Sequence, residues 1–376
     1  MGYKEDIEKI IEEQLERIER MKANQQFTDY SKLDKIVIGV IPGDGIGTVI
    51  SREAKRVLKV LLAGELEKGR IILKDIEGLT LENRIAKKEA VPADVLKEIK
   101  ACNLLLKGPT TTPSKGDGLP NIESANVTLR RELDLFANVR PVNIPELGID
   151  WVFYRENTEG EYVLGSRGVD VSPEMAMDFK VTTDLGTQRI ARAAFEYAKA
   201  NGNKNVSIVT KANIMKKTDG KFLDICYQVA KEYPEIKTDD WYVDIMAANL
   251  INPAIRQGFN VFVLPNLYGD IITDEAAQLQ GGVGTAGSAN IGSRYAMFEA
   301  IHGSAPRMVA EGIAEHANPA SLLKAAEMML RHIGMAEKAD LLRDAIDGAS
   351  KELQMSGDGR GNTAGEFGDL VIKNLG

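Results

Sequence analysis

The feature that most constrains this chain is the alternation of short apolar runs with longer segments patterned as helices. The runs at 36–41 and 261–264 are short and rich in β-branched or aromatic residues, which predicts buried strands. We expect further strands at 71–76, 102–107, 205–210 and 241–244. We expect helices at 47–63, 92–100, 184–200, 218–232, 252–257, 319–333, 335–350 and 365–374. Such alternation favours an α/β fold with a parallel or mixed sheet covered by helices on both faces.

Two segments interrupt this alternation. Residues 3–22 are charged and helix-favouring, with apolar residues at helical spacing, namely Ile7, Ile10, Ile11, Leu15, Ile18 and Met21. With the polar stretch up to residue 35 they form an N-terminal amphipathic extension, which we expect to pack on the body of the protein or on a partner subunit. Residues 160–183 carry several glycines and a proline among short β-prone pieces. They predict a small β-excursion that reaches outward and could contact a second subunit.

Composition argues against several classes of function. The 376 residues are 44% hydrophobic and 27% charged, as in an ordinary soluble enzyme, and the formal net charge of −8 disfavours nucleic acid or an anionic membrane as the main partner. No apolar run approaches the ~18 residues of a membrane span, and no secretory leader is evident. The two cysteines, Cys102 and Cys226, lack metal-ligand spacing. We therefore expect reduced thiols and a cytoplasmic protein.

The segment 268–274, YGDIITD, places two carboxylates four residues apart just after an apolar run. If 265–270 forms a turn and a helix starts near Asp270, then Asp270 and Asp274 share one face near the helix N-terminus. Close carboxylates repel, and a divalent metal bound through hard oxygen ligands would relieve that repulsion. An acidic helix start is nevertheless the commoner explanation of such a pair, because the helix dipole favours acids there.

The loop at 42–47, PGDGIG, follows a strand and opens a helix, where a phosphate-binding loop would lie. Its glycines run G-x-G-x-G, which differs from the Rossmann fingerprint G-x-G-x-x-G. A phosphate loop and a tight strand-to-helix turn are both open interpretations.

Arginines gather between residues 123 and 157 in spite of the acidic background. Ser124, Asn126 and Arg130 have spacings that place them on one side of a short helix or turn, and Arg140 and Arg155 follow. Arginine suits bidentate capture of carboxylates, so the group fits a polyanionic substrate, although neighbours such as Arg131 and Glu132 could simply pair on the surface. Tyr162 and Lys211 are candidate acid–base groups, and Lys211 closes a strand, where α/β proteins place ligands.

Eight strings occur in an order that identifies a family resemblance: PGDGIG (42–47), KGPTTTP (107–113), LRRELDLFANVRP (129–141), FYRENTEGEY (153–162), KANIMK (211–216), NLYGDIITD (266–274), FEAIHGSAP (298–306) and AEMMLRHIG (326–334). From about residue 36 onward the chain resembles the β-decarboxylating dehydrogenases of isocitrate, isopropylmalate, homoisocitrate and tartrate. The resemblance implies an isopropylmalate-dehydrogenase-like α/β fold, not a Rossmann fold, with two α/β domains around a mixed sheet. It implies a large domain of 36–136 and 282–376, and a small domain of 137–281 whose clasp, about 160–183, lies at a dimer interface.

The resemblance also implies a metal-dependent oxidation and decarboxylation of a 2-hydroxy acid. Mg²⁺ or Mn²⁺ is expected at Asp270 and Asp274, with Asp244 from the partner subunit. Lys211, also from the partner, is expected to assist hydroxyl deprotonation, and Tyr162 to protonate the product carbon. Arg130, Arg140 and Arg155 are expected to hold substrate carboxylates. A site built from two chains makes a homodimer the minimum functional unit, with no nucleic acid or membrane partner.

The implied substrate is isocitrate, an intermediate of the tricarboxylic acid cycle. Family members that act on isocitrate carry a Ser-x-Asn pair before the arginine motif, and this chain has Ser124 and Asn126 at that place. Family members that act on isopropylmalate present an apolar surface there instead. Glu123 and the loop at 114–122 leave homoisocitrate open, and 3-isopropylmalate is the other alternative substrate. A non-catalytic regulatory subunit is a further alternative, against which Tyr162, Lys211 and the three aspartates argue.

The implied redox cofactor is NAD, with NADP as the alternative. Residues expected to contact it are Lys107, Thr111, Asn213, His302, Gly303, Ala305, Arg307 and Asn318. Arg307 replaces both the acidic residue usual in NAD enzymes and the Lys-Tyr pair usual in NADP enzymes. Arg307 and Arg360 could bind a 2′-phosphate, but the glycine-rich segment 356–361 lacks the tyrosine of NADP forms.

Overall fold

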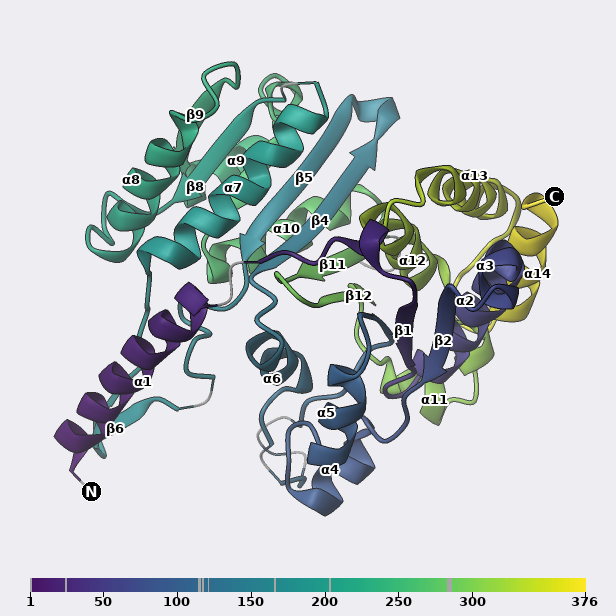
Figure 1. Cartoon of the computed structure of the whole chain (residues 1–376), viewed down its shortest axis with the longest axis horizontal. Coiled ribbons are helices and arrows are strands. Elements are labelled where there is room, and N and C mark those ends of the chain that lie inside the picture. The colour runs from purple at the N-terminus through teal and green to yellow at the C-terminus, as the bar shows by residue number, and fades with distance from the viewer. Residues whose placement is uncertain are drawn as a thin grey trace. The chain divides into compact units, whose positions relative to one another are not determined.

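The computed structural model describes residues 2–23, 26–113, 116, 118–120, 122–165, 167–202, 204–282 and 286–376. Contacts within the chain divide it into two compact units, whose segments can be followed in Figure 1. Unit 1 comprises 1–27, 134–280 and 291–293, and unit 2 comprises 28–133, 281–290 and 294–376. None of the helices in the described ranges combines the length and apolar character that crossing a membrane requires.

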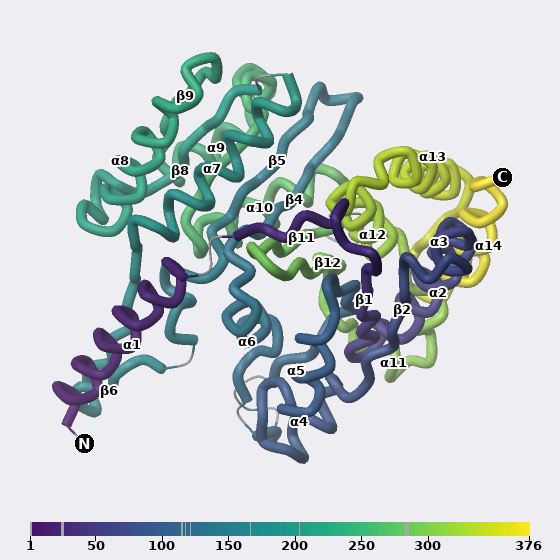
Figure 2. The backbone as a smooth tube through the Cα atoms, in the orientation of Figure 1, coloured from purple at the N-terminus to yellow at the C-terminus, as the bar shows by residue number. Residues whose placement is uncertain are grey.

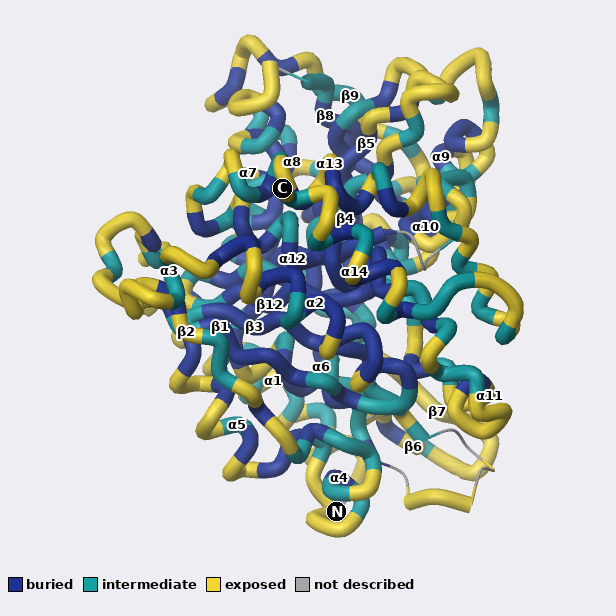
Figure 3. The backbone as a smooth tube through the Cα atoms, turned by 90° about the vertical axis from the view of Figure 1, so that its right-hand side faces the viewer, coloured by how far each residue is buried: buried dark blue, intermediate teal, exposed yellow. Residues whose placement is uncertain are grey.

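Unit 2 is built on strands in the order β2–β1–β3–β12–β11. β1 pairs in parallel with both β2 and β3, and β12 pairs in parallel with β3. The strands are β1 (Ile36–Ile41), β2 (Ile71–Asp75), β3 (Leu104–Lys107), β11 (Gly287–Ile291) and β12 (Ala296–Ala300). The helices are α2 (Gly47–Leu61), α3 (Ala63–Glu67), α4 (Leu81–Lys87), α5 (Ala93–Lys100), α6 (Ala125–Glu132), α11 (Pro306–Ala310), α12 (Ala320–His332), α13 (Ala336–Glu352) and α14 (Ala364–Asn374). Figure 3 shows β1, β3 and β12 as buried segments, consistent with parallel strands covered on both faces.

Unit 1 is built on strands in the order β4–β5–β10–β8–β9. β4 and β5 are antiparallel and the remaining pairs are parallel, so this sheet is mixed. The strands are β4 (Ala137–Ile144), β5 (Ile149–Glu156), β8 (Val206–Thr210), β9 (Thr238–Tyr242) and β10 (Val261–Leu264). The helices are α1 (Tyr3–Ala23), α7 (Asp184–Ala200), α8 (Thr218–Ala230), α9 (Val243–Leu250) and α10 (Asn266–Leu279). The α/β prediction with a mixed sheet is confirmed.

Side chains on the two faces of the unit 1 strands pack into two separate hydrophobic cores. Val152, Val206 and Val263 pack against α7 and α8, while Phe153 and Phe262 pack against α9 and α10. Figure 1 shows α7 and α8 on the near side of these strands and α10 on the far side. The rings of Phe153 and Phe262 stack with centroids 4.3 Å apart. The period of two along each strand therefore distributes the apolar residues between two helix layers.

Three predicted elements near the candidate site differ from the structure. α10 already begins at Asn266, so 265–270 is not a turn and Asp270 lies one turn inside the helix. β9 ends at Tyr242, and Asp244 lies in the first turn of α9 instead of in a strand. The helix predicted at 252–257 is replaced by a short 3₁₀ turn at Arg256–Gly258. Pro253 accounts for the last difference, because it lacks an N–H and disfavours helical geometry at the preceding residue.

The β-excursion predicted at 160–183 forms a small antiparallel hairpin. β6 (Val169–Ser172) pairs with β7 (Met175–Met177), and Gly160 and Val181 form an isolated bridge at its base. The tube in Figure 2 shows α1 beside β6, and α1 also contacts α7. The N-terminal extension therefore packs on unit 1 of its own chain.

A buried ion pair joins α1 to the base of the hairpin. Arg17 Nη2 lies 2.8 Å from Glu159 Oε1, and the two side chains are 13% and 3% exposed. Glu159 also accepts hydrogen bonds from the backbone and hydroxyl of Thr183, which caps α7. Burial and the charge of Glu159 raise the pKa of neighbouring Glu156. Arg17 thus supplies positive charge to a region with two buried carboxyl groups.

Replacing Arg17 by alanine should lower the free energy of unfolding by about 2 kcal/mol, because it leaves Glu159 buried without its cation while the Thr183 bonds persist. Arg20→Ala is the matched control, since Arg20 and its partner Glu16 are 66% and 74% exposed. We expect that control to change stability by less than about 0.5 kcal/mol. Urea unfolding of the three proteins measures both effects, and equal losses would contradict a special role for Arg17.

Candidate active site

Two aspartates of α10 meet two arginines from neighbouring strands of unit 1. Arg155 of β5 donates a hydrogen bond to Asp270, and Arg140 of β4 lies 3.0 Å from Asp274 and 3.5 Å from Asp270. The arginine side chains are buried, whereas Asp270 and Asp274 are 34% and 61% exposed. The guanidinium groups therefore compensate the repulsion that the helical spacing of the two carboxylates creates.

Tyr162 joins the same cluster. Its hydroxyl donates to Asp270 Oδ2 at 2.7 Å, and the Arg155 guanidinium lies 5.4 Å from its ring centroid. The arrangement brings a phenolic proton next to a carboxylate and a buried cation. Five predicted site residues on four separate segments thus converge within unit 1.

Asn266 and Gly269 support this cluster and were not identified from the sequence as site residues. Asn266 Oδ1 accepts hydrogen bonds from Arg155 at 3.1 and 2.7 Å. A Cβ on Gly269 would lie 2.5 Å from Arg155 Cγ, so only glycine lets α10 approach the arginine this closely. Both residues belong to the string NLYGD, but their roles depend on contacts with β5.

Lys211 and Asp244 form a second pair in unit 1. Lys211 follows β8 and its ammonium group hydrogen-bonds Asp244 in α9, which lowers the pKa of the aspartate. Asn213 is exposed in the turn after Lys211. Within the described residues, no three acidic, histidine or cysteine side chains come together in a way that would hold a metal ion. One chain therefore does not unite Asp244 with Asp270 and Asp274.

The donor set on α10 fits a hard divalent cation in part. Asp270 and Asp274 offer carboxylate oxygens from one helix face, which are ligands that Mg²⁺ and Mn²⁺ prefer. Two carboxylates leave several coordination positions for other oxygen ligands. A third protein carboxylate would have to come from outside the described part of this chain.

In unit 2 the buried carboxylate of Glu299 binds two predicted site residues. Lys107 Nζ lies 3.2 Å from Glu299, and Arg130 Nη2 lies 3.3 Å from its other oxygen. Burial by itself raises the pKa of Glu299, but the charges of Lys107 and Arg130 and a hydrogen bond from Asn290 outweigh it and lower the pKa to about 2. Lys107 is fully buried, so its ammonium group binds the Glu299 carboxylate and does not reach the protein surface.

Helix α6 carries three residues predicted to contact substrate. Ser124 is its N-cap residue, and Asn126 and Arg130 lie four residues apart on the helix. Asn126 Oδ1 accepts from the Thr110 hydroxyl at 3.2 Å, which directs the amide NH₂ away from Thr110. The predicted surface pair of Arg131 and Glu132 is wrong: Arg131 binds Glu123 at 3.0 Å, and Glu132 binds Lys100 at 2.8 Å.

The PGDGIG loop acts as a structural turn in unit 2. Asp44 N–H donates to Pro109 O at 2.7 Å, and Ile46 N–H donates to Ser304 O at 3.0 Å. The Asp44 carboxylate accepts from Thr111 N–H at 2.7 Å, and the hydroxyls of Thr111 and Ser304 lie 2.7 Å apart. Backbone donors that a phosphate loop would offer a ligand are thus used by the chain itself, which favours the tight-turn interpretation.

The segment from His302 to Ala305 has features that fit a nucleotide cofactor. His302 Nε2 is buried and has no hydrogen-bond partner among the described residues, and burial lowers the pKa of this imidazole. A Cβ on Gly303 would meet nothing within 4 Å, which leaves space beside the loop. Ala305 has a φ of +46°, and turns the chain into α11. The open space beside Gly303 leaves room for a ligand next to this loop.

Among the other cofactor candidates of unit 2, Asn318 is half-buried, whereas Arg307 and Arg360 are exposed. Asn318 accepts from Ala320 N–H at 2.9 Å at the start of α12. Arg307 is 72% exposed and lies 3.5 Å from Glu311, and Arg360 is 87% exposed and lies 2.5 Å from Asp358. Each arginine that was considered for a 2′-phosphate therefore has an acidic neighbour.

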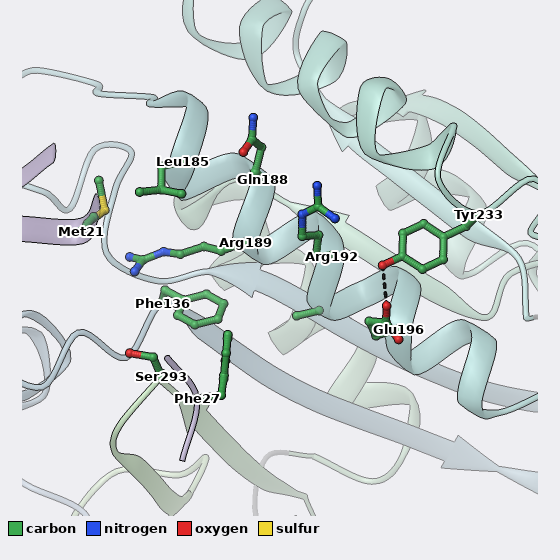
Figure 4. Close-up of a pocket in the computed structure, with 11 residues that line it drawn as sticks. Met21, Phe27, Phe136, Leu185, Gln188, Arg189, Arg192, Glu196, Tyr233 and Ser293 are labelled. Atoms are coloured by element: carbon green, nitrogen blue, oxygen red, sulfur yellow. Dashed lines mark hydrogen bonds between the residues drawn. The ribbon is translucent and has the colours of Figure 1, made fainter. Parts of the chain in front are cut away.

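A separate cavity of about 660 Å³ lies in unit 1, away from these residues. Met21, Phe27, Phe136, Leu185, Arg189 and Tyr233 contribute to its lining. Figure 4 shows Arg189 beside Phe136 and the Tyr233 hydroxyl directed at Glu196, to which it donates at 2.6 Å. Arg189 also forms a bidentate pair with Asp134 at 2.7 and 2.8 Å. These polar groups bind one another, so the cavity does not indicate a particular ligand.

Comparisons with known proteins assign the fold and the chemistry class. The family model for isocitrate/isopropylmalate dehydrogenase matches residues 37–371. A homoisocitrate dehydrogenase from Methanocaldococcus jannaschii is 40% identical over 82% of this chain and 88% of its own length. An NADP isocitrate dehydrogenase from Rickettsia prowazekii is 41% identical over 82% of this chain and 62% of its own length.

A solved isocitrate dehydrogenase from Methylococcus capsulatus matches with a TM-score of 0.78 and 34% identity, covering 90% of this chain and 99% of that one. Members of the matched family are decarboxylating dehydrogenases that use NAD or NADP and a divalent metal, act on small molecules and often form dimers. The extent of these matches, together with the fold and the charged cluster on α10, shows that the chain belongs to the isocitrate/isopropylmalate dehydrogenase family.

Proposed function

We propose that this chain catalyses the oxidative decarboxylation of isocitrate to 2-oxoglutarate and carbon dioxide, with reduction of NAD and dependence on Mg²⁺ or Mn²⁺. The observation that carries the proposal is the convergence of Arg140, Arg155 and Tyr162 on Asp270 and Asp274. Buried guanidinium groups beside exposed carboxylates suit a substrate that is a polycarboxylate and is bound next to a cation.

The residues of the chain have separate roles in this proposal. Arg140 and Arg155 orient substrate carboxylates, Lys211 assists deprotonation of the substrate hydroxyl, and Tyr162 donates a proton to the carbon that loses carbon dioxide. The bound metal supplies Lewis-acid polarisation of substrate oxygens, and the nicotinamide supplies the hydride acceptor. The hydrogen bond from Tyr162 to Asp270 holds the phenol beside this site.

We further propose a homodimer in which Lys211 and Asp244 serve the site of the partner subunit. Support comes from exposed apolar residues on the adjoining segments that carry Lys211, Asp244 and the α10 aspartates, namely Ile214, Met215, Tyr242, Ile245, Ile251 and Ile271. Ile245 follows Asp244 directly and Ile271 follows Asp270 directly. Apolar side chains clustered in this way favour burial against another protein surface.

Isocitrate is favoured by the polar character of α6. Ser124, Asn126 and Arg130 offer a hydroxyl, an amide and a cation, which suit a distal carboxylate and would be left unpaired by an isopropyl group. Homoisocitrate carries the same carboxylates on a longer chain, and the 40% identical relative named for it makes it the alternative substrate. NAD is favoured because Glu311 and Asp358 would compete with a 2′-phosphate for Arg307 and Arg360.

Kinetics with each 2-hydroxy acid and each cofactor test the proposed function directly. With Mn²⁺ present, isocitrate and NAD should give the highest kcat/KM among isocitrate, homoisocitrate and 3-isopropylmalate combined with NAD or NADP. Asn126→Ala should lower kcat/KM for isocitrate by about 10-fold or more, because a buried carboxylate contact is lost. Predominant turnover of isopropylmalate would contradict the substrate proposal. Activation of another subunit without turnover would indicate a regulatory role.

Asp270→Asn should lower kcat/KM by about 100-fold or more and raise the metal concentration needed for half-maximal activity, because a charged ligand is lost. Glu275→Gln removes a carboxylate from the same helix and is the matched control, expected to stay within about two-fold of the parent. Activity titrated with Mn²⁺ measures both variants. If Asp270→Asn reaches half-maximal activity at the same Mn²⁺ concentration as the parent, the metal assignment is wrong.

Tyr162→Phe should slow decarboxylation and reprotonation by about 10²- to 10⁴-fold, as expected for loss of a general acid. Reduction of added oxalosuccinate should fall less, because that step does not need the phenolic proton. Tyr227→Phe is the control, since Tyr227 donates to Asp240 in a different part of unit 1. Equal losses in the two partial reactions would argue against this role for Tyr162.

A further inference from the structure

A buried ion pair of Lys180 and Asp219 lies next to the backbone of Lys211. Lys180 Nζ is 2.5 Å from Asp219 Oδ1, and the two side chains are 6% and 0% exposed. Lys180 lies between the β6–β7 hairpin and α7, and Asp219 lies in the first turn of α8. Apolar residues of similar volume often stabilise a fold as well as a buried ion pair does, so stability alone does not explain it.

The second oxygen of Asp219 binds the backbone of Lys211. Asp219 Oδ2 accepts the Lys211 N–H at 2.8 Å, and Lys211 O accepts from the N–H groups of Ile214 and Met215 at 2.9 Å each. Both backbone polar groups of Lys211 are thereby held. These bonds hold the backbone from which the Lys211 side chain extends to Asp244.

Lys180 contacts the neighbours of two other proposed site residues. Its ammonium group lies 4.4 Å from the ring centroid of Tyr268 and 3.3 Å from the Tyr268 hydroxyl. It also lies 3.2 Å from Glu161, which precedes Tyr162, while Tyr268 is two residues before Asp270. One buried cation therefore connects the turn of Lys211 with the segments that carry Tyr162 and Asp270.

The surroundings keep this cation charged. Burial lowers the pKa of Lys180, but the hydrogen bond and charge of Asp219 outweigh burial, so the pKa ends above its ordinary value. Lys180 contacts one oxygen of the Asp219 carboxylate, and the other oxygen accepts the Lys211 N–H. A charge-assisted bond of this kind is stronger and shorter than a neutral one.

We propose that Asp219 is a positioning residue for Lys211 and that Lys180 is the counter-ion that holds the Asp219 carboxylate in place. The proposal rests on the proposed function, because it takes Lys211 to assist deprotonation of the substrate hydroxyl. Displacing a catalytic group by about 1 Å can cost about 100-fold in rate without weakening substrate binding.

Steady-state kinetics separate positioning from a purely structural role. Asp219→Ala should lower kcat about 100-fold while KM stays within about three-fold. Asp219→Asn should recover about half of that loss on a logarithmic scale, because its amide oxygen can still accept the Lys211 N–H. A lowered melting temperature with unchanged kcat would overturn the proposal.

A double-mutant cycle with Lys211→Met gives the decisive readout. If Asp219 acts through Lys211, adding Asp219→Ala to Lys211→Met should cause no further loss of kcat. Losses that multiply would overturn the proposal, because Asp219 would then act independently of the lysine. Arg17→Ala is the control buried pair, and it should lower stability in both backgrounds while leaving kcat within about two-fold.

Folding failure and failure of the proposed function remain distinguishable. If Asp219→Ala does not fold, Asp219→Asn and Lys180→Met enter the same cycle and should show the same lack of additivity. If Lys211→Met alone keeps parental activity, the proposed role of Lys211 is wrong and the positioning proposal falls with it. If Lys211→Met loses activity and Asp219→Asn and Lys180→Met both keep it, the positioning proposal alone is wrong.

Discussion

Charge compensation around α10 is the interaction on which the candidate site of unit 1 depends. Asp270 and Asp274 share a helix face, so their carboxylates repel, and Arg140 and Arg155 offset that repulsion from the adjacent strands. Gly269 allows the helix to lie directly on Arg155, and Asn266 fixes its guanidinium group. The same contacts that make the helix fit the sheet therefore also arrange two anions and two cations, as the proposed binding of a polycarboxylate and a metal requires.

Two further buried carboxylates, Glu299 and Asp219, also have specific partners of opposite charge. Glu299 binds Lys107 and Arg130 in unit 2, and Asp219 binds Lys180 in unit 1. Removing a charge from water is costly, and a partner of opposite sign recovers that cost only in good geometry. The pairs next to proposed site residues are therefore better explained by orientation than by stability. Arg17 and Glu159 extend the pattern to the N-terminal helix, which begins before the segment matched by the family.

The sequence predicted those parts of the site whose spacing is meaningful by itself. The four-residue interval between Asp270 and Asp274 indicated one helix face, and the position of Lys211 after an apolar run indicated the end of a strand. Glu299 and Asp219 gave no such signal, because a single acid within an apolar run or a polar turn resembles any surface residue. Their roles arise from contacts with residues 192 and 39 positions away in the chain, respectively Lys107 and Lys180. Pattern and period carry no information about such distant partners.

Taken alone, the sequence determined the alternation of strands and helices, the α/β class, the family and most of the chemical groups of the site. Local periodicity is sufficient for these, because it depends on neighbours three, four or two residues apart. Tertiary structure decided that α10 begins at Asn266, that the PGDGIG loop binds its own chain, and that Lys107 accompanies the buried carboxylate of Glu299. These outcomes depend on packing between segments far apart in the chain, where the close approach of two backbones or two charges selects one arrangement among those that local pattern allows.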